Sequence, residues 1–361
     1  GLLHQVIAGQ ATENLAPNHQ ALYQAAQTNY VLAEGQQEIV VPLTWQSPNG
    51  IVVTKRYVFQ RGSFNVKVEH EVQNNSNQLW SGSEYRQLKH GPHIATGSLL
   101  TGVQAYVGGA YYYDDKYTKV GFEDMETTPL ALTTNGGWVA MLQHYFVSAW
   151  IPDQQQQTHY YSKGLSQLGA KSYVLGSTGP LRQIAAGAKD TFSTSLYVGP
   201  KDQDNLEQLA KGLDLTVDYG IFAFVSKPIF WLMQTIHSVV GNWGWTIIFL
   251  TLIIKLIFFY PSAASYKSMA KMKAVAPRLK EIGERYASDP QAKQKAIMEI
   301  YRKEKINPLG GCLPILIQIP VFMGLYWVIL ESVELRQAPW MLWYKDLSIM
   351  DPFFVLPLIM G

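Results

Sequence analysis

The chain has 361 residues, a formal net charge of +2 and a single cysteine, Cys312. One cysteine excludes an intrachain disulfide and a metal site built from several thiolates, and the small net charge argues against a protein that binds DNA or another polyanion over its whole surface. Charged residues make up only 16% of the chain, below the ~25% of average soluble domains, and the mean hydropathy of −0.03 averages two unlike halves. The polar start and the apolar end, 353–360, indicate a piece of a longer protein.

The first 217 residues show the pattern of a β domain. Apolar side chains alternate with polar ones along 64–72, and a period of two places one set on a core face. That set is Phe64, Val66, Val68, His70 and Val72. A Pro-Asn-Gly turn precedes a second strand, 51–60. Further strands are expected over 38–45, 138–150, 172–175 and 191–198, with a closing helix over 204–213. We predict a large antiparallel β-sandwich over 1–217.

The stretch 218–240 is apolar but contains Ser226-Lys227-Pro228. Proline in the first turn after a serine cap marks a helix start, so a helix is expected to begin there. Its apolar residues share one face: Ile229, Leu232, Met233, Ile236 and Val240. We predict an amphipathic helix lying in a membrane interface, with a transmembrane span as the alternative.

Residues 241–361 carry apolar runs close to the ~20 residues that a membrane helix needs. Helices are expected over 243–260 and 312–333, and the start of another over 352–361. Between the first two, 261–311 holds eleven Lys and Arg against five acidic residues. Because positively charged loops stay in the cytoplasm, this loop is predicted to be cytoplasmic and the β domain to lie on the other side, in the periplasm.

The cytoplasmic segment 262–306 is predicted to be a helical hairpin. Apolar residues recur in it at three- and four-residue steps, and Asp289-Pro290 is a cap for the second helix. Its candidate contact residues are basic: Lys267, Lys271, Lys273, Arg278, Lys280 and Arg285. They contact ribosomal RNA or anionic lipid, or they form a solvated face.

Three polar side chains interrupt the predicted membrane helices. Lys255 is a cation among Ile253, Ile254 and Leu256, which is costly in hydrocarbon unless it is solvated or paired. It either extends to the membrane surface or lines a polar interior, to which Thr251, one turn away, would belong. Gln318 either joins helices by a hydrogen bond or lines a wet cavity.

Ordered motifs run through both halves of the chain. In the second half they are SMAKM at 268–272, NPLGGCLP at 307–314, QIP at 318–320 and VELRQAP at 333–339. In the first half and at the junction they are YVLAEG at 30–35, GGWVAMLQ at 136–143, LDLTVDYG at 213–220 and VGNWG at 240–244. Together they resemble the YidC/Oxa/Alb family of membrane protein insertases, in its Gram-negative form with a large outer domain.

The resemblance implies a periplasmic β-supersandwich followed by an α-helical polytopic membrane domain with a hydrophilic groove open to cytoplasm and lipid. Lys255 matches the cationic groove position, which is usually Arg in the family, and lysine keeps the charge but not the bidentate fork. Thr251 and Gln318 match other groove positions. Ile319, Pro320 and Phe322 match the surface against which a client segment packs. The family's first membrane helix and last core helices are not in this sequence.

The implied function is insertion and folding of nascent membrane proteins in the bacterial inner membrane, alone or with the Sec translocon. The lipid bilayer is a further partner and the ribosome a candidate one, with no DNA, metal or cofactor. No nucleophile motif, P-loop or zinc-protease motif is present, so we expect no enzyme. The alternative is a membrane-anchored periplasmic domain that binds or processes carbohydrate, which would need a paired Glu and His in one cleft.

Overall fold

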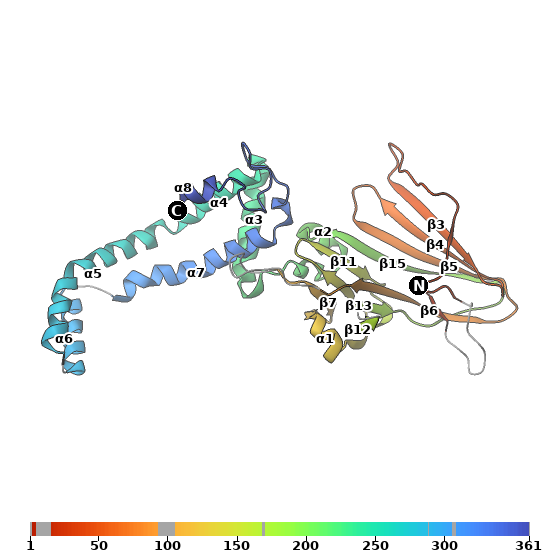
Figure 1. The fold of residues 1–361 in the computed structure, drawn as a ribbon, viewed down its shortest axis with the longest axis horizontal. Coiled ribbons are helices and arrows are strands. Elements are labelled where there is room, and N and C mark those ends of the chain that lie inside the picture. Colours follow the sequence, from red (N-terminus) through yellow and green to blue (C-terminus); the bar gives the residue numbers. More distant parts are fainter. Residues whose placement is uncertain are drawn as a thin grey trace. The chain divides into compact units, whose positions relative to one another are not determined.

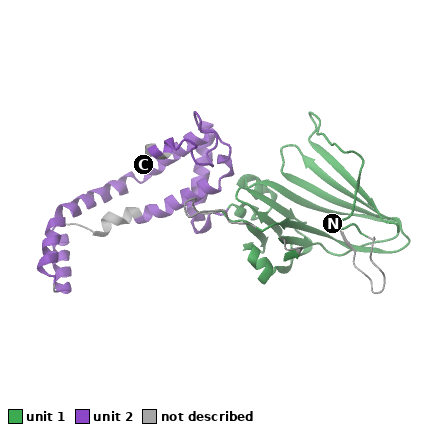
Figure 2. Ribbon diagram, viewed as in Figure 1, with its two compact units in different colours: residues 1–217 green, residues 218–361 purple. Residues whose placement is uncertain are grey.

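A computed structural model describes residues 2–4, 16–92, 105–167, 170–287, 289–304 and 308–360. The chain divides into two units, 1–217 and 218–361 (Figure 2). The first unit is built mainly of strands and the second of helices (Figure 1). We call them the β unit and the helical unit.

The larger sheet of the β unit has nine strands, all paired antiparallel. Their order is β2 (Gln24–Ala25), β3 (Glu38–Gln46), β4 (Ile51–Gln60), β5 (Asn65–Asn74), β15 (Lys189–Pro200), β11 (Phe146–Ile151), β10 (Trp138–Leu142), β7 (Gly108–Tyr113) and β8 (Lys116–Val120). The period-two prediction for β5 is confirmed at Val68, His70 and Val72, which are buried. It was wrong for Phe64, which precedes the strand and is exposed.

The smaller sheet has six strands and is also antiparallel. It contains β1 (Leu2–His4), β6 (Trp80–His90), β13 (Ala170–Thr178), β12 (Gln157–Gln167) and β9 (Ala131–Asn135) in this order, with β14 (Arg182–Ile184) also paired to β6. Trp80 of this sheet packs in one cluster with Val53 and Phe192 of the larger sheet. A second cluster joins Leu175 to Met141. The core therefore lies between the two sheets.

Two predicted elements of the β unit are interrupted in the structure. The single strand expected over 138–150 is two strands, β10 and β11, because the amide of Gln143 donates to the carbonyl of Phe146, 2.9 Å away, and closes a turn. The helix expected over 204–213 ends early, as α2 (Gln203–Leu209), and a short 3-10 helix follows over Leu213–Thr216. Gly212 between them has a φ of 75°, a conformation that favours glycine and breaks a helix. A further short helix, α1, spans Phe122–Thr127.

Among the described residues, the helical unit contains two short 3-10 helices, Gly220–Phe222 and Val333–Leu335, and six α-helices. They are α3 (Ala223–Val240), α4 (Trp243–Ile257), α5 (Phe259–Arg285), α6 (Pro290–Lys303), α7 (Pro308–Glu331) and α8 (Val355–Met360). Helix α3 contacts α4 and α7, and α5 contacts α4, α6 and α7. Ser288 and 305–306 of the predicted hairpin, Asn307 after it, and Gly361 of the predicted last helix lie outside the described residues.

Helix α3 begins earlier than predicted. It starts at Ala223, so Pro228 lies inside the helix rather than in its first turn. Proline lacks the N–H that would bond the carbonyl four residues back, and the helix tolerates this loss because Pro228 is exposed near its N-terminal end. The predicted apolar face is confirmed at Ile229 and Met233, which are buried, while Lys227 is exposed.

The helix predicted over 243–260 ends at Ile257, and the first helix of the predicted hairpin begins at Phe259 instead of 262. The two axes meet at 59°. Pro261 explains the break, because its missing N–H leaves the carbonyl of Ile257 without its helical partner. Among the described residues no single helix is both long enough and apolar enough to cross a bilayer. Helices α4 and α5 meet these requirements only when they are taken together, as a bent pair.

Candidate functional site

Helix α4 starts at a cap that is joined to the segment after α7. Asn242 is the N-cap, and its side-chain oxygen accepts from the amide of Trp245 at 3.2 Å. The amide group of the same side chain donates to the carbonyls of Pro339 and Trp340, at 3.1 and 3.3 Å. One side chain therefore sets both the start of α4 and the position of the 339–340 backbone.

Aromatic rings surround this capped end. His237 of α3 stacks on Trp243, with ring centres 3.7 Å apart, and Trp340 meets Trp245 edge to face at 5.9 Å. A Cβ added to Gly244 would collide with the Trp340 ring, so glycine permits this close approach. Tryptophans gathered at one helix end are typical of a membrane–water interface.

Lys255 lies near the other end of α4, on its exposed side. Leu250 and Ile254 are buried against the unit, whereas Leu256 and Ile257 are 71% and 65% exposed. The Lys255 side chain is exposed too, and no hydrogen bond or ion pair to it is found within the described part of the chain. Thr251 is half-buried and its hydroxyl donates to the carbonyl of Ile247 at 2.8 Å. Lys255 is thus a solvent-accessible cation on an apolar surface.

Helix α7 has one packed side and one exposed apolar side. On the packed side, the hydroxyl of Ser226 in α3 donates to the carbonyl of Gly324 at 3.1 Å. On the other side, Ile319 and Phe322 are 48% and 50% exposed, and Pro320 is half-buried. Sequence reasoning missed further members of the stripe, Leu316, Met323 and Tyr326. Their spacing of three, four and seven residues around Ile319 is the signal that would have found them.

The three predicted polar groove residues lie in the same unit but are not in direct contact. Gln318 is half-buried on α7, while Lys255 and Thr251 are on α4. Within the described residues, no hydrogen bond joins Gln318 to Lys255 or Thr251. Both helices contact α3 and α5, so these two helices set the separation of the polar groups. The groove itself stays a prediction.

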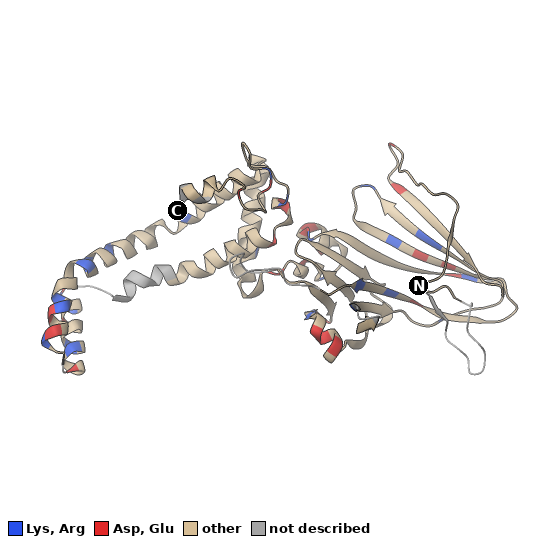
Figure 3. Cartoon of the chain, viewed as in Figure 1, with Lys and Arg blue, Asp and Glu red and all other residues tan. Residues whose placement is uncertain are grey.

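The predicted hairpin is formed by α5 and α6. Asp289 caps α6 as expected, its carboxylate accepting from the amides of Gln291 and Ala292 at 3.0 Å each. All six candidate basic residues lie on α5 and are exposed, and Figure 3 shows Lys and Arg along this helix in blue. Arg278 pairs with Glu304 at 2.8 Å, an exposed ion pair of little energetic weight. The remaining charges are available to a polyanionic surface.

Asp351, which sequence reasoning missed, organises the segment before α8. Its carboxylate accepts from the indole N–H of Trp343 at 3.0 Å and from the backbone amides of Phe353 and Leu356 at 3.0 and 2.9 Å. Burial by itself would raise the pKa of Asp351, but these hydrogen bonds hold its pKa below the ordinary value. The Asp-Pro pair ahead of an apolar run was the available sequence signal.

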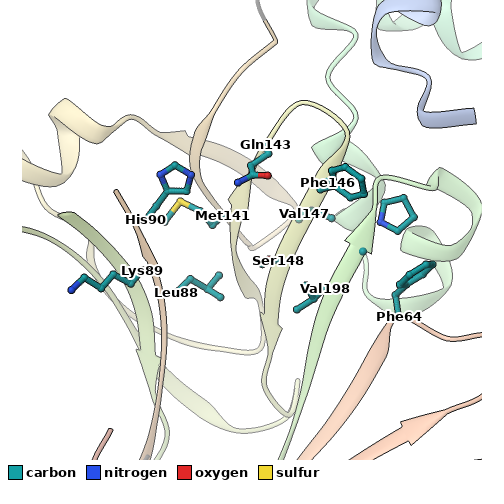
Figure 4. A pocket seen from close by; sticks show the side chains of 12 residues that line it. Phe64, Leu88, Lys89, His90, Met141, Gln143, Phe146, Val147, Ser148 and Val198 are labelled. Atoms are coloured by element: carbon teal, nitrogen blue, oxygen red, sulfur yellow. The ribbon is translucent and has the colours of Figure 1, made fainter. Parts of the chain in front are cut away.

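The β unit holds an open cavity of about 540 Å³. Figure 4 shows His90 and Met141 toward one side of it and Phe146, Val198 and Phe64 toward the other. The lining is mostly apolar, and His90 stacks on Phe122 at 5.3 Å. The lining side chains do not include a paired Glu and His, so this cavity lacks the acid–base pair that sugar chemistry would need.

Comparison with known proteins identifies the family to which this chain belongs. The model of the YidC periplasmic domain matches residues 4–232, and the model of the 60Kd inner membrane protein matches 235–361. The chain belongs to the YidC family. A relative from Thioalkalivibrio sulfidiphilus, named membrane protein insertase YidC, is 48% identical over 361 residues, which are all of this chain and 64% of that protein. A relative of the same name from Pseudomonas putida is 52% identical over 94% of this chain and 60% of its own length.

The chain therefore spans somewhat under two thirds of the length of these YidC relatives. Among solved structures, a galactose mutarotase related enzyme from Lactobacillus acidophilus aligns over 49% of this chain and 71% of its own, at 10% identity and a TM-score of 0.33. That score is too low to support any statement about activity. The family assignment predicted from the motifs is confirmed.

Proposed function

We propose that this chain is the part of a membrane protein insertase that receives client segments, with Lys255 as the cation that attracts them. The observation that carries the proposal is the exposed Lys255 ammonium on the apolar surface of α4, in a chain whose curated relatives are named insertases. A free cation in apolar surroundings is expensive, and attraction of acidic client flanks gives a reason for it.

The proposed mechanism needs no cofactor. A client's apolar segment gains free energy when it enters lipid, whereas its polar flank meets a dielectric barrier. A wet cationic surface near Lys255, Thr251 and Gln318 lowers that barrier for acidic flanks, because attraction is stronger where the dielectric constant is low. The exposed apolar stripe of α7, with Ile319, Pro320 and Phe322, offers the client a packing surface.

The proposed setting is the bacterial inner membrane, with α3 in the interface and several membrane passes. The aromatic end of α4 and the bent α4–α5 pair support it. The basic side chains of the hairpin are proposed to contact anionic lipid or ribosomal RNA. Cooperation with the Sec translocon rests on the family resemblance alone.

The test of the site is client insertion into proteoliposomes by a full-length protein in which the Thioalkalivibrio relative supplies the parts outside this chain. Clients carry no, one or several acidic residues in the translocated flank. We expect Lys255→Ala to lower insertion of the most acidic client about tenfold, Lys255→Arg to keep it, and Lys255→Glu to be worst. Lys345→Ala, which removes another exposed cation of the helical unit, is the matched control.

Equal insertion by Lys255→Ala and the unmodified protein across that client series would contradict the proposed role. It would leave a lysine that merely extends to the membrane surface. Because the series varies only the client's charge, a general folding defect is distinguishable: it would lower insertion of every client alike.

The topology is tested by cysteine labelling in a Cys312→Ser background. Asn49 and Lys280 are both exposed. A cysteine at Asn49 is expected to react with an impermeant reagent from the periplasmic side, and one at Lys280 only after the inner membrane is opened. Labelling of both from the same side would overturn the proposed orientation.

The carbohydrate alternative is not favoured. A Glu–His pair does exist in the β unit, with Glu84 Oε1 at 3.1 Å from His70 Nδ1. However, the other oxygen, Oε2, accepts from Arg86 Nη2 at 2.6 Å, so both carboxylate oxygens have a partner. The pair belongs to a buried hydrogen-bonded network that includes the Glu84–Arg86 ion pair, rather than to a free general base.

A further inference from the structure

A buried triad of polar side chains lies between the two sheets of the β unit. His70 on β5, Glu84 on β6 and Arg86 on β6 are 2%, 1% and 6% exposed. Glu84 bonds both neighbours through its two oxygens. The proposed insertion of clients makes no use of this triad, and buried charges are usually fully hydrogen-bonded.

The triad leaves polar atoms without a protein partner. Arg86 Nε and Nη1 and His70 Nε2 are buried, and none has a hydrogen-bond partner among the described residues. The Glu84 carboxylate can only accept, so the Nδ1 atom of His70 carries the proton that joins them. Burial lowers the pKa of His70 and keeps the ring neutral, so Nε2 is an acceptor. Among the described residues, Arg86 thus has two donor nitrogens and His70 one acceptor nitrogen without a protein partner.

These residues line a pocket of about 180 Å³. Lys55 and Tyr57 of β4 line it too, and the Lys55 ammonium lies 4.8 Å from the centre of the Tyr57 ring. Two cations and one anion therefore surround the space, which leaves an excess positive charge in a partly closed site. At ~30 Å³ each, about six water molecules would fill this volume, so it fits a small organic molecule and not a chain segment.

We infer that this pocket binds a small free carboxylate that also bears a hydroxyl group. The carboxylate would accept from Arg86 Nε and Nη1 and neutralise the excess charge, with Lys55 beside it. The hydroxyl would donate to His70 Nε2. Charge-assisted hydrogen bonds of this kind are the strong ones in proteins, and a buried guanidinium with unmade bonds has the most to gain from them.

The test is ligand-observed NMR of lactate binding to the full chain in detergent micelles, independent of any insertion assay. Lactamide has nearly the same shape and hydroxyl group but no charge, and we expect it to bind about tenfold more weakly, because it cannot form the charge-assisted pair. Equal binding of lactate and lactamide would show that the pocket does not recognise the carboxylate group, and would overturn the proposal. Lactate binding that never saturates would mean that water alone serves the triad, and would overturn the proposal as well.

Two lysine variants provide a matched pair. Lys55→Gln removes the charge at the pocket, and we expect lactate binding to weaken about fivefold. Lys163 likewise lies over a tyrosine ring, 5.5 Å from the centre of Tyr161, but lines a different pocket. Lys163→Gln should leave lactate binding unchanged. Equal losses in both variants would show a non-specific charge effect and refute the assignment.

The variant Arg86→Lys tests whether the guanidinium N–H groups of Arg86 bind the ligand. It keeps the positive charge beside Glu84 but loses the planar fork, so a protein that still folds, checked by circular dichroism, should bind lactate and lactamide equally weakly. Retained discrimination between the two ligands would contradict the role of Arg86. If this variant does not fold, the Lys55 and Lys163 pair still decides the question.

Discussion

The β unit and the helical unit place their large apolar side chains in opposite ways. In the β unit, Trp80, Trp138 and Tyr160 are almost completely buried between or beside the sheets, whereas in the helical unit Leu256, Phe259 and Tyr260 are more than two thirds exposed. Soluble monomers rarely expose contiguous apolar surface of this kind. The difference teaches that the β unit supplies its own core, while the helical unit needs apolar surroundings from outside the chain.

The largest expected effect compares two tryptophans, one from each unit. Trp138 stacks on Tyr112 with ring centres 5.8 Å apart, and its indole N–H donates to the carbonyl of Lys211 at 3.1 Å. Trp138→Ala should lower the free energy of unfolding of the β unit by about 3–5 kcal/mol. Trp231 of α3 is 65% exposed, and Trp231→Ala should leave that energy unchanged. Urea unfolding followed by circular dichroism measures both, and similar losses would break the contrast between the units.

Two glycines within helices sharpen the comparison inside the helical unit. Gly244→Ala would drive a methyl group into Trp340, and overpacking of this kind costs about 1–3 kcal/mol. At Gly283 the nearest outside atom is Lys293 Nζ, 3.8 Å away, so Gly283→Ala should stabilise by about 0.5–1 kcal/mol through helix propensity. Thermal unfolding in lipid nanodiscs shows whether each substitution lowers or raises the stability of the helical unit. A stabilising Gly244→Ala would show that Trp340 does not rest on α4.

The smallest expected effect is the pH dependence at Asp351. Its pKa is lower in the folded chain than in the unfolded one, so its stabilising contribution is complete above the ordinary value of about 3.9. That contribution is lost as the pH falls through the lowered pKa. The indole N–H resonance of Trp343, which donates to Asp351, should shift in that acidic range. In Asp351→Asn the shift should be absent; its persistence would assign it to another group.

The sequence was sufficient where one local pattern decides the structure. Alternation predicted β5 through Val68 and Val72, and the Asp289-Pro290 pair predicted the start of α6. Prediction failed where contacts between segments far apart in the sequence determine the structure. Pro228 is tolerated inside α3, and the β-unit triad joins residues 14 positions apart on strands of different sheets. The periodicity of apolar residues, two in strands and 3.6 in helices, does not predict such pairings, because tertiary packing creates them.

The family resemblance predicted more of the candidate site than the residue patterns alone could. Lys255 and Gln318 already stand out as polar residues in apolar runs, and the family resemblance gave them a groove role. Phe322 was chosen by family position alone, and the structure adds that Lys255 and Phe322 are exposed while Gln318 is half-buried. It also adds the aromatic cap around Asn242, whose partners lie 97 and 98 positions along the chain. A side chain that bonds so distant a backbone leaves no local trace in the sequence.

In the proposed membrane setting, the break at Phe258 has a consequence for the surrounding lipid. The straight part of α4 has 15 residues, which at the helical rise gives about 22 Å. The hydrocarbon layer of a bilayer is about 30 Å thick. A helix embedded by this short length creates a hydrophobic mismatch, which a bilayer relieves by becoming thinner around it. Under the proposed function, the proline that bends the helix would in this way shorten the distance that a client's polar flank has to cross.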